Sequence, residues 1–231
     1  GYELVVRTAA SGVCHSDLHF VDGFYFMPGP AILGHEAAGI VEAVGPLVTE
    51  VVPGDHVIAC LSIYCGKCDR CLVGETHLCG NKPVRDPDVN PGVLWDGKGV
   101  RQFAGLGSYA EKMLLHENAV VKIDKDMPFQ QAALIGCGVT TGVGAALKTA
   151  KVQAGSTVVV FGAGGVGLSA IQGARIAGAR TIIAVDRIEH KLATARELGA
   201  THSVDASTED AVQKVQELTG GGADYAFECV G

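Results

Sequence analysis

Four cysteines lie close together in the sequence and could hold a metal ion. They are Cys65, Cys68, Cys71 and Cys79. Two residues separate Cys65 from Cys68 and Cys68 from Cys71, and seven separate Cys71 from Cys79, so a short loop can wrap the sulfurs around one ion. Four thiolates at about 2.3 Å are the usual ligands of a structural Zn²⁺. Two disulfides are the alternative, but this spacing accommodates them poorly and a cytosolic chain would not keep them oxidised. The spacing therefore predicts a zinc site.

Three further residues of soft-ligand type stand outside that cluster. Cys14 and His35 lie near the start of the chain, and Cys137 follows much later. Each is flanked by glycine or sits at an expected turn, where the backbone can bring a ligand to a shared centre. Two cysteines and one histidine with an open fourth position form a catalytic zinc set. Taken singly, each has a plainer interpretation as a small buried thiol or a structural histidine.

A glycine-rich motif of the form G-x-G-x-x-G separates an apolar run at residues 157–161 from a helix-like segment at 166–177. Its candidate binding residues are Gly162, Gly164, Gly165, Val166 and Gly167. Such glycines let a backbone turn and approach a pyrophosphate, whose charge is met by the helix N-terminus. We therefore expect a dinucleotide site here.

Asp186 lies 19 residues after Gly167, at the end of a second apolar run. A carboxylate in that position accepts hydrogen bonds from the adenosine ribose hydroxyls and repels a 2′-phosphate, which favours NAD over NADP. Arg187 and Lys191 could partly neutralise that repulsion. The alternative interpretation of Asp186 is a helix cap or a solvated strand end.

Two kinds of element must position these residues. Residues 1–140 carry many glycines and short β-branched runs, such as 3–7, 39–44 and 56–59, which indicate a β-barrel-like domain. Residues 141–231 carry continuous apolar runs at 157–161 and 181–185, as in strands buried on both faces of a parallel sheet.

Helices are expected between the strands of the second region. They are predicted at 166–177, at about 190–198 and at about 208–218, with a short strand near 203–204 and a last strand at 225–230. This order predicts the first half of a doubly wound sheet.

The composition bounds the function. The chain has 231 residues, 48% of them hydrophobic, and a net charge of −7 without any basic run, so we expect no nucleic-acid partner. No run of 18 apolar residues and no signal peptide are evident, which predicts a cytoplasmic protein with no membrane association. Because both ends fall beside strand-like runs, we interpret the sequence as an internal fragment.

Together these motifs resemble the zinc-dependent alcohol dehydrogenases of the medium-chain dehydrogenase/reductase superfamily. The resemblance spans essentially the whole chain and keeps the order of the motifs. It implies an α/β protein with a GroES-like β-barrel catalytic domain at 1–140. A Rossmann domain that binds NAD, truncated at its C-terminal end, would follow at 141–231.

The resemblance also implies roles for single residues. Cys14, His35 and Cys137 would hold the catalytic zinc, Glu36 would lie behind that ion, and Asp17 would orient His35. The structural zinc would occupy the four-cysteine loop, giving two Zn²⁺ per chain.

Residues around the cofactor follow from the same resemblance. Ser16 and His19 correspond to a proton relay, His15 to a contact with the cofactor pyrophosphate, and Lys191 to a contact with the adenosine ribose.

The function implied is hydride transfer between an alcohol and NAD, with an aldehyde or ketone as the reverse substrate. A homodimer is expected, with a homotetramer as the alternative. Within the family, an S-(hydroxymethyl)glutathione dehydrogenase is a second hypothesis, although the arginine usual in that class four residues after the last cysteine is Pro83 here, with Arg85 two further on. The third hypothesis comes from another functional class: the protein would be a zinc-less or non-catalytic binding relative of the same fold.

Overall fold

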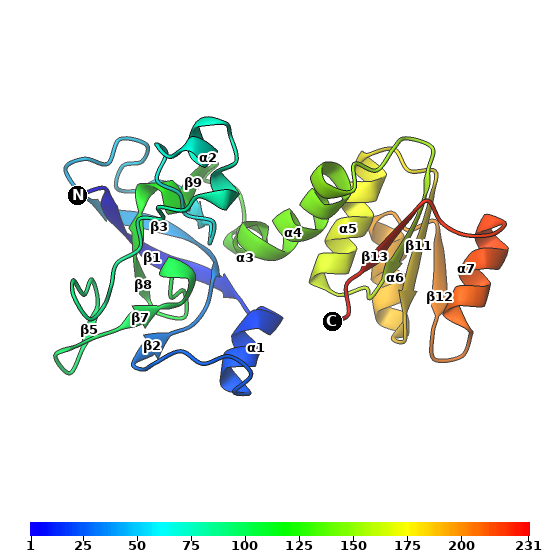
Figure 1. The fold of residues 1–231 in the computed structure, drawn as a ribbon, viewed down its shortest axis with the longest axis horizontal. Helices are drawn as coiled ribbons and strands as arrows, with labels where there is room; N and C mark the ends of the chain where they lie inside the picture. The colour runs from blue at the N-terminus through cyan, green and yellow to red at the C-terminus, as the bar shows by residue number, and fades with distance from the viewer. The chain divides into compact units, whose positions relative to one another are not determined.

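The computed structural model describes residues 1–231. The contacts within the chain divide it into two compact units (Figure 1). The first unit is Gly1–Cys137 and the second is Gly138–Gly231. The sequence prediction placed a domain boundary between residues 140 and 141. The division by contacts assigns Cys137 to the first unit, together with the other residues predicted to bind the catalytic metal.

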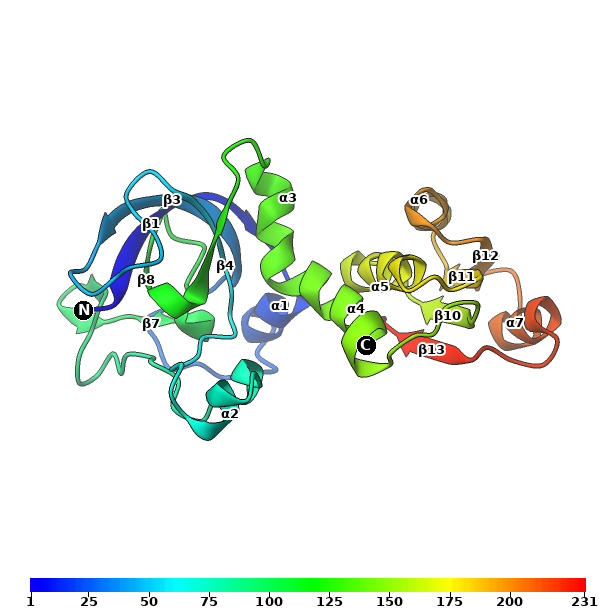
Figure 2. The same cartoon turned by 90° about the horizontal axis from the view of Figure 1, so that it is seen from above.

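A five-stranded antiparallel sheet, in the order β8-β1-β3-β4-β9, organises the first unit. Its strands are β1 (Glu3–Gly12), β3 (Glu36–Val44), β4 (His56–Ala59), β8 (Lys112–His116) and β9 (Val120–Ile123). The pairing of β1 with β3 shifts register at Val5/Val6 and at Thr8/Ala10. Such bulges bend a strand, and the two strands curve around the core of this unit (Figure 2).

One face of this sheet is apolar. Leu4, Val6, Val57, Met113 and Leu115 are almost fully buried in one cluster. Leu4 and Val6 are two residues apart, as are Met113 and Leu115, so alternate side chains of β1 and β8 point to the same face. This alternation favours the observed register, because a shift by one residue would turn these apolar side chains to the other face.

Short elements complete the first unit. The helices are α1 (His15–Val21), α2 (Asp69–Leu72), η1 (Thr76–Leu78), η2 (Phe103–Gly105) and η3 (Glu117–Ala119); the strands are β2 (Ala31–Ile32), β5 (Leu94–Trp95), β6 (Lys98–Gly99) and β7 (Arg101–Gln102). β2 pairs with β7 in parallel, and β5 with β6 in a hairpin.

A helical run at Phe129–Thr149 was not predicted from the sequence. It comprises α3 (Phe129–Leu134), the π-helical turn η4 (Ile135–Val139), α4 (Thr140–Gly144) and the π-helical turn η5 (Ala145–Thr149). Its glycines and β-branched residues have low helix propensity, which hides the pattern. By length and composition alone the run could span a membrane, a test that core helices of soluble proteins also pass.

A four-stranded parallel sheet in the order β12-β11-β10-β13 forms the second unit. Its strands are β10 (Thr157–Phe161), β11 (Thr181–Asp186), β12 (His202–Asp205) and β13 (Tyr225–Glu228), connected by α5 (Gly165–Ile176), α6 (Glu189–Leu198) and α7 (Ala211–Thr219). This order is the start of a doubly wound sheet. β11 and β12 are added on one side of β10, and the chain then crosses over to place β13 on the other side.

Both faces of this sheet are covered. Val158 and Val160 pack with residues of α5 and α6, whereas Val159 and Val204 pack with Val215 of α7. Figure 2 shows α6 and α7 on opposite sides of the strands. Burial on both faces explains why these strands are continuous apolar runs.

The predicted strands and helices of the second unit agree with the structure within three residues. The last strand ends at Glu228, because Glu228 Oε1 accepts hydrogen bonds from the amides of Val230 and Gly231 and turns the chain there. Cys60 and Cys229 are half-buried and lie just beyond strand ends.

Candidate metal centre and dinucleotide site

Asp17 is a buried residue whose carboxylate connects several parts of the first candidate site. It occupies the first turn of α1, and its Oδ2 accepts a hydrogen bond of 3.1 Å from the amide of Cys14, the residue that precedes the helix. A carboxylate here satisfies an amide that the helix leaves unpaired and suits the positive end of the helix dipole. The start of α1 therefore places Cys14 and Asp17 side by side.

The same carboxylate reaches the segment that leads into β3. Its Oδ1 accepts a hydrogen bond of 3.0 Å from the amide of Gly34 and lies 3.3 Å from Nδ1 of His35. The side chains of Asp17 and His35 are only 2% and 4% exposed. When Nδ1–H donates to the carboxylate, Nε2 keeps its lone pair for a metal ion. The predicted contact between Asp17 and His35 is present in the structure.

Cys14, His35 and Cys137 come together as a metal site requires. One ligand atom from each of these residues, and one carboxylate oxygen of Glu36, lie within 4.8 Å of one another. A tetrahedral zinc site separates its ligands by about 3.5–3.8 Å, so small movements bring these donors onto one ion. Glu36, expected behind the ion, has its carboxylate inside this group. The four residues are hereafter the mixed-ligand cluster.

Cys137 belongs to the π-helical turn η4. A π-helical turn widens an α-helix and often occurs at functional sites. Burial raises the pKa of the Cys137 thiol to about 12, and the neighbouring Cys14 thiol and Glu36 carboxylate raise it too. Two thiols and a carboxylate crowded in a partly buried place concentrate negative charge, and a divalent cation is the natural partner of such a donor set.

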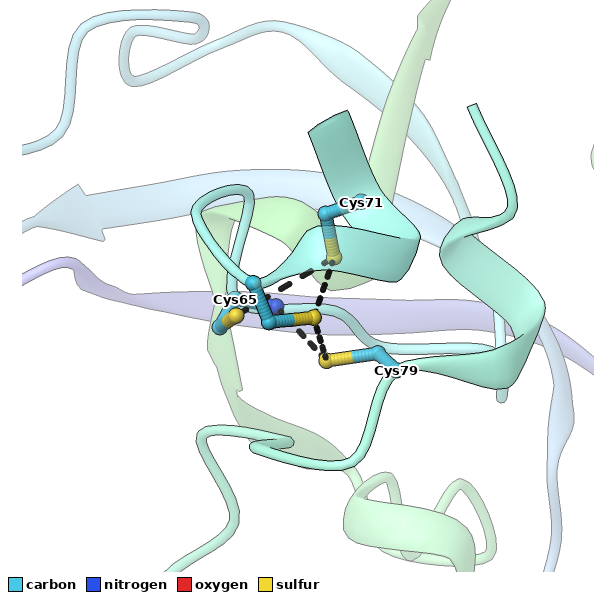
Figure 3. A group of neighbouring side chains, drawn as sticks. Cys65, Cys71 and Cys79 are labelled. Carbon is cyan, nitrogen blue, oxygen red and sulfur yellow. Dashed lines mark hydrogen bonds between the residues drawn. The ribbon is translucent and has the colours of Figure 1, made fainter. Parts of the chain in front are cut away.

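The second candidate site is the four-cysteine loop, residues 65–79. Figure 3 shows the sulfurs of Cys65, Cys71 and Cys79 pointing toward one another. The Sγ atoms of Cys65 and Cys71 are 4.0 Å apart, those of Cys68 and Cys71 are 3.5 Å apart, and those of Cys68 and Cys79 are 3.9 Å apart. Tetrahedral ligands at about 2.3 Å from an ion lie about 3.8 Å from each other.

These thiols are all free and form no disulfide. The amide and side chain of Cys71 lower the pKa of the Cys68 thiol to about 6, and burial raises the pKa of the Cys71 thiol to about 11. The amide of Cys65 also donates to Sγ of Cys79 over 3.3 Å. The loop thus holds four convergent sulfurs that fit a structural metal ion.

The helix α1 also carries the predicted relay residues. Ser16 and His19 are three residues apart and share one face of the helix. The rings of His15 and His19 lie 4.9 Å apart, and Tyr25 packs edge-on against His19 at 5.2 Å. His15 is exposed, whereas Ser16 and His19 are half-buried.

Two aromatic residues beside the mixed-ligand cluster were not predicted from the sequence. Phe103, in η2, meets the His35 ring at 5.1 Å and 90°, and it also packs against Phe20 of α1. Tyr109 lies close to Asp17. Neither residue sits in a recognisable motif, so only the three-dimensional structure relates them to the metal ligands.

The glycine-rich loop joins β10 to α5, as predicted. Gly164 precedes the helix and Gly165, Val166 and Gly167 form its first turn, where amides lack partners within the helix. A side chain on Gly167 would collide with the carbonyl oxygen of Gly162, so the loop can close this tightly only with glycine there. The exposed amides of the first turn suit a pyrophosphate.

Asp186 ends β11 and holds this loop in place. Its Oδ2 accepts a hydrogen bond of 2.8 Å from the amide of Ala163, and its Oδ1 accepts bonds from the amides of Arg187 and Ile188. Each oxygen of a carboxylate has two acceptor sites, so Oδ2, which accepts one hydrogen bond, could take a second from a ribose hydroxyl. Arg187 is exposed beside it; the pKa of Asp205 is lowered mainly by hydrogen bonds from Ser207, and the charge of Arg187 lowers it further.

Comparison with known proteins agrees with this geometry. Residues 1–125 match the family model of the alcohol dehydrogenase GroES-like domain, and residues 165–231 match the zinc-binding dehydrogenase model. The chain belongs to the zinc-dependent alcohol dehydrogenases. The family matches confirm the predicted fold class, a GroES-like domain followed by part of a Rossmann sheet within the medium-chain superfamily.

Solved structures of this alcohol dehydrogenase family give the same result. An alcohol dehydrogenase zinc-binding domain protein from Burkholderia ambifaria is 42% identical with a TM-score of 0.90, and benzyl alcohol dehydrogenase from Acinetobacter calcoaceticus is 42% identical with a TM-score of 0.87. Each match covers 100% of this chain and 64% of the other. A putative zinc-binding dehydrogenase from Sinorhizobium meliloti 1021 bound to NADP is 30% identical, with a TM-score of 0.80, over 100% of this chain and 63% of that one. The chain thus spans less than two thirds of these relatives.

Proposed function

We propose that the protein to which this chain belongs is an oxidoreductase that transfers hydride between an alcohol and NAD at a catalytic zinc ion. The observation that carries the proposal is the meeting of Cys14, His35 and Cys137 in one cluster, with Asp17 orienting the imidazole. Two cysteines and one histidine are the protein ligands of the catalytic zinc in alcohol dehydrogenases.

The residues of each site have distinct tasks. Cys14, His35 and Cys137 would hold the catalytic zinc, which, when bound, acts as a Lewis acid on the substrate oxygen. Glu36 lies near enough to supply a further oxygen donor to the same ion. Cys65, Cys68, Cys71 and Cys79 would hold a second zinc that only stabilises the loop.

Ser16 and His19 would carry the proton of the alcohol away from the site. A hydroxyl can accept and donate a proton in the same step, and an imidazole exchanges protons with water near neutral pH. Their placement on one face of α1, next to the Cys14 ligand, supports this relay. His15, at the exposed start of the helix, would meet the cofactor pyrophosphate.

The second unit would bind NAD, which accepts the hydride. The first turn of α5 would hold the pyrophosphate and Asp186 the adenosine ribose, with Lys191 beside it. The negative charge of Asp186 supports NAD over NADP. The relative that binds NADP and the exposed Arg187 make NADP the alternative to measure.

Aromatic alcohols are the substrate class that we propose to test first. The relative that is a benzyl alcohol dehydrogenase shares 42% identity. Exposed aromatic side chains also gather after α1, where Phe24 and Tyr25 pack against His19. Flat rings recognise one another through edge and face contacts.

The test uses the full-length protein. We expect two zinc ions per chain by metal analysis, and oxidation of benzyl alcohol with NAD at a higher kcat/KM than with NADP. Turnover of S-(hydroxymethyl)glutathione but not of benzyl alcohol would assign the thiol-adduct reaction instead. A protein that holds no zinc and reduces quinones, or that shows no turnover at all, would overturn the proposal.

We further propose that the full-length protein is a cytoplasmic homodimer. Light scattering of the purified protein distinguishes a dimer from a tetramer.

A further inference from the structure

Two histidines of α1 lie one helical turn apart. His15 and His19 are four residues apart, so their side chains project from the same face of the helix. Their ring centroids are 4.9 Å apart, and the ring planes are inclined by 60°. Asp17 lies two residues from each histidine, about 200° around the helix, and its carboxylate faces the mixed-ligand cluster. The two imidazoles therefore lie on the side of α1 that faces away from that cluster.

The separation of the two rings fits the chelation of one metal ion. A histidine nitrogen binds Zn²⁺ at about 2.0–2.1 Å, which puts the ion about 3.2 Å from the centre of the ring. Two rings on one ion then have centres about 4.5 Å apart in right-angled coordination and about 5.2 Å apart in tetrahedral coordination. The observed 4.9 Å lies between these values. Rotation about χ2 is soft and leaves the centre of a ring almost in place, so a nitrogen of each ring can turn toward the ion.

The nitrogens of both rings are free to bind an ion. No hydrogen bond or ion pair joins an imidazole nitrogen of His15 or His19 to another group of the chain. By contrast, Nδ1 has a polar partner in His35, His116 and His202. The ring of His15 is exposed and that of His19 is half-buried, so an ion can approach the pair from solvent.

The chain also holds the pair in place before any ion binds. The rings of Phe24 and Tyr25 pack edge-on against His19 at 5.5 Å and 5.2 Å. The amide of Tyr25 donates to the carbonyl oxygen of His19 over 3.1 Å. His15 begins α1, whose first turn is fixed by the carboxylate of Asp17. A pair that is already ordered loses less conformational freedom when it binds a ligand.

We propose that His15 and His19 form a third metal site, a two-imidazole chelate for one Zn²⁺ ion, and that this ion inhibits the enzyme. Imidazole is a common ligand of Zn²⁺, and two histidines at this spacing bind it in other helices. With only two protein ligands, the ion is held more weakly than the other two zinc ions and is removed by dialysis.

The inhibition rests on the proposed function, whereas the metal site does not. An imidazole nitrogen that binds a metal ion has no lone pair left to accept a proton. The ion would therefore block His19 in the proposed proton relay. It would also occupy His15, which we propose meets the cofactor pyrophosphate.

The first experiment titrates Zn²⁺ into the dialysed full-length protein, which already holds its two zinc ions, in a calorimeter. We expect one further equivalent to bind. His15→Asn and His19→Asn should each abolish it, because a chelate needs both rings, while metal analysis still finds the first two ions. His190→Asn is the matched control, since His190 is exposed in α6 and has no histidine one turn away. It should bind the further ion as the wild type does.

The second experiment measures alcohol oxidation during the same titration. Turnover of the wild type should fall as the further ion binds and recover when a chelator removes that ion. The turnover that remains in His15→Asn should not respond to added zinc.

The outcomes separate the metal site from the proposed function. The absence of a further equivalent, or its persistence in either histidine variant, would overturn the site. Full turnover with the further ion bound would overturn the inhibition. A protein that oxidises no alcohol before zinc is added would instead overturn the proposed function, and calorimetry would still decide whether His15 and His19 bind metal.

Discussion

Asp186 Oδ2 and the amide of Ala163 are joined by a hydrogen bond of 2.8 Å between the end of β11 and the glycine-rich loop. The residue expected to recognise the ribose thus also anchors the loop that is expected to face the pyrophosphate. Substitution of Asp186 should consequently affect both halves of the dinucleotide site.

We predict that Asp186→Ala weakens NADH binding by about 10- to 100-fold, since hydrogen bonds to a charged group contribute about 1.5–3 kcal/mol. The preference for NADH over NADPH should also disappear, because the repelling charge is gone. Fluorescence titration with both cofactors measures the two effects. Asp205→Ala is the control, because Asp205 lies opposite Asp186 on the neighbouring strand. An unchanged cofactor preference in Asp186→Ala would contradict the role in specificity.

Asp17→Asn should lower zinc affinity at the mixed-ligand cluster by about 10- to 100-fold. An amide side chain loses the negative charge that holds the Nδ1–H of His35. Competition with a zinc chelator measures the affinity. Asp22→Asn, an exposed position just after the same helix, should bind zinc as the wild type does. Equal affinity of the two variants would remove Asp17 from the orientation of His35.

Ser16→Ala should reduce kcat for alcohol oxidation by about 100-fold or more while both zinc ions remain bound, since general acid–base groups contribute about that much. Steady-state kinetics and metal analysis check the two parts separately. Ser207→Ala changes an exposed serine of the second unit and serves as the control. Turnover that stays at the wild-type value would take Ser16 out of the proposed relay.

Cys68→Ser should release one zinc ion and lower the melting temperature more than it changes the chemistry. The site depends on its four sulfurs, and an ion bound only in the folded state stabilises that state. Metal content and calorimetry measure the loss, with Cys60→Ser as a control outside the loop. A variant that melts with the wild type would show that the site is not structural.

Asp55 predicts a dependence of stability on pH. A hydrogen bond with Lys122, at 2.8 Å, and the amide of Val52 lower its pKa from the ordinary value of 3.8. A depressed pKa stabilises the folded state above the unfolded-state value, and this contribution is lost as the pH falls through 3.8 and below. Melting curves of the wild type and of Asp55→Asn should therefore differ at pH 7 and converge below pH 3.8. The exposed Asp124 provides the control substitution to Asn.

Much of this architecture can be predicted from the sequence, because it depends on local patterns. The strands β10 and β11 are buried on both faces, so their apolar runs mark their limits almost to the residue. The spacing of the four cysteines is equally local, because one short loop holds all its sulfurs. Motifs of this kind predicted the fold class, which the family matches confirm.

Other features depend on contacts between distant segments and could not be predicted in this way. Tyr109 meets Asp17 across 92 positions of sequence, without any motif around it. The carboxylate of Glu36 joins the cluster because β3 begins there, beside the end of β1. The helix that carries Cys137 has weak helix formers and a π-helical turn, so its periodicity is obscured.

The four-cysteine loop has one last consequence. Neither α2 nor η1 buries a hydrophobic side chain, so the order of this segment comes from its sulfurs and not from a core. A chelator should therefore loosen this segment before the sheet beneath it melts. A protease added at that moment would cut the backbone among residues 66–78 while the remainder of the unit resists digestion.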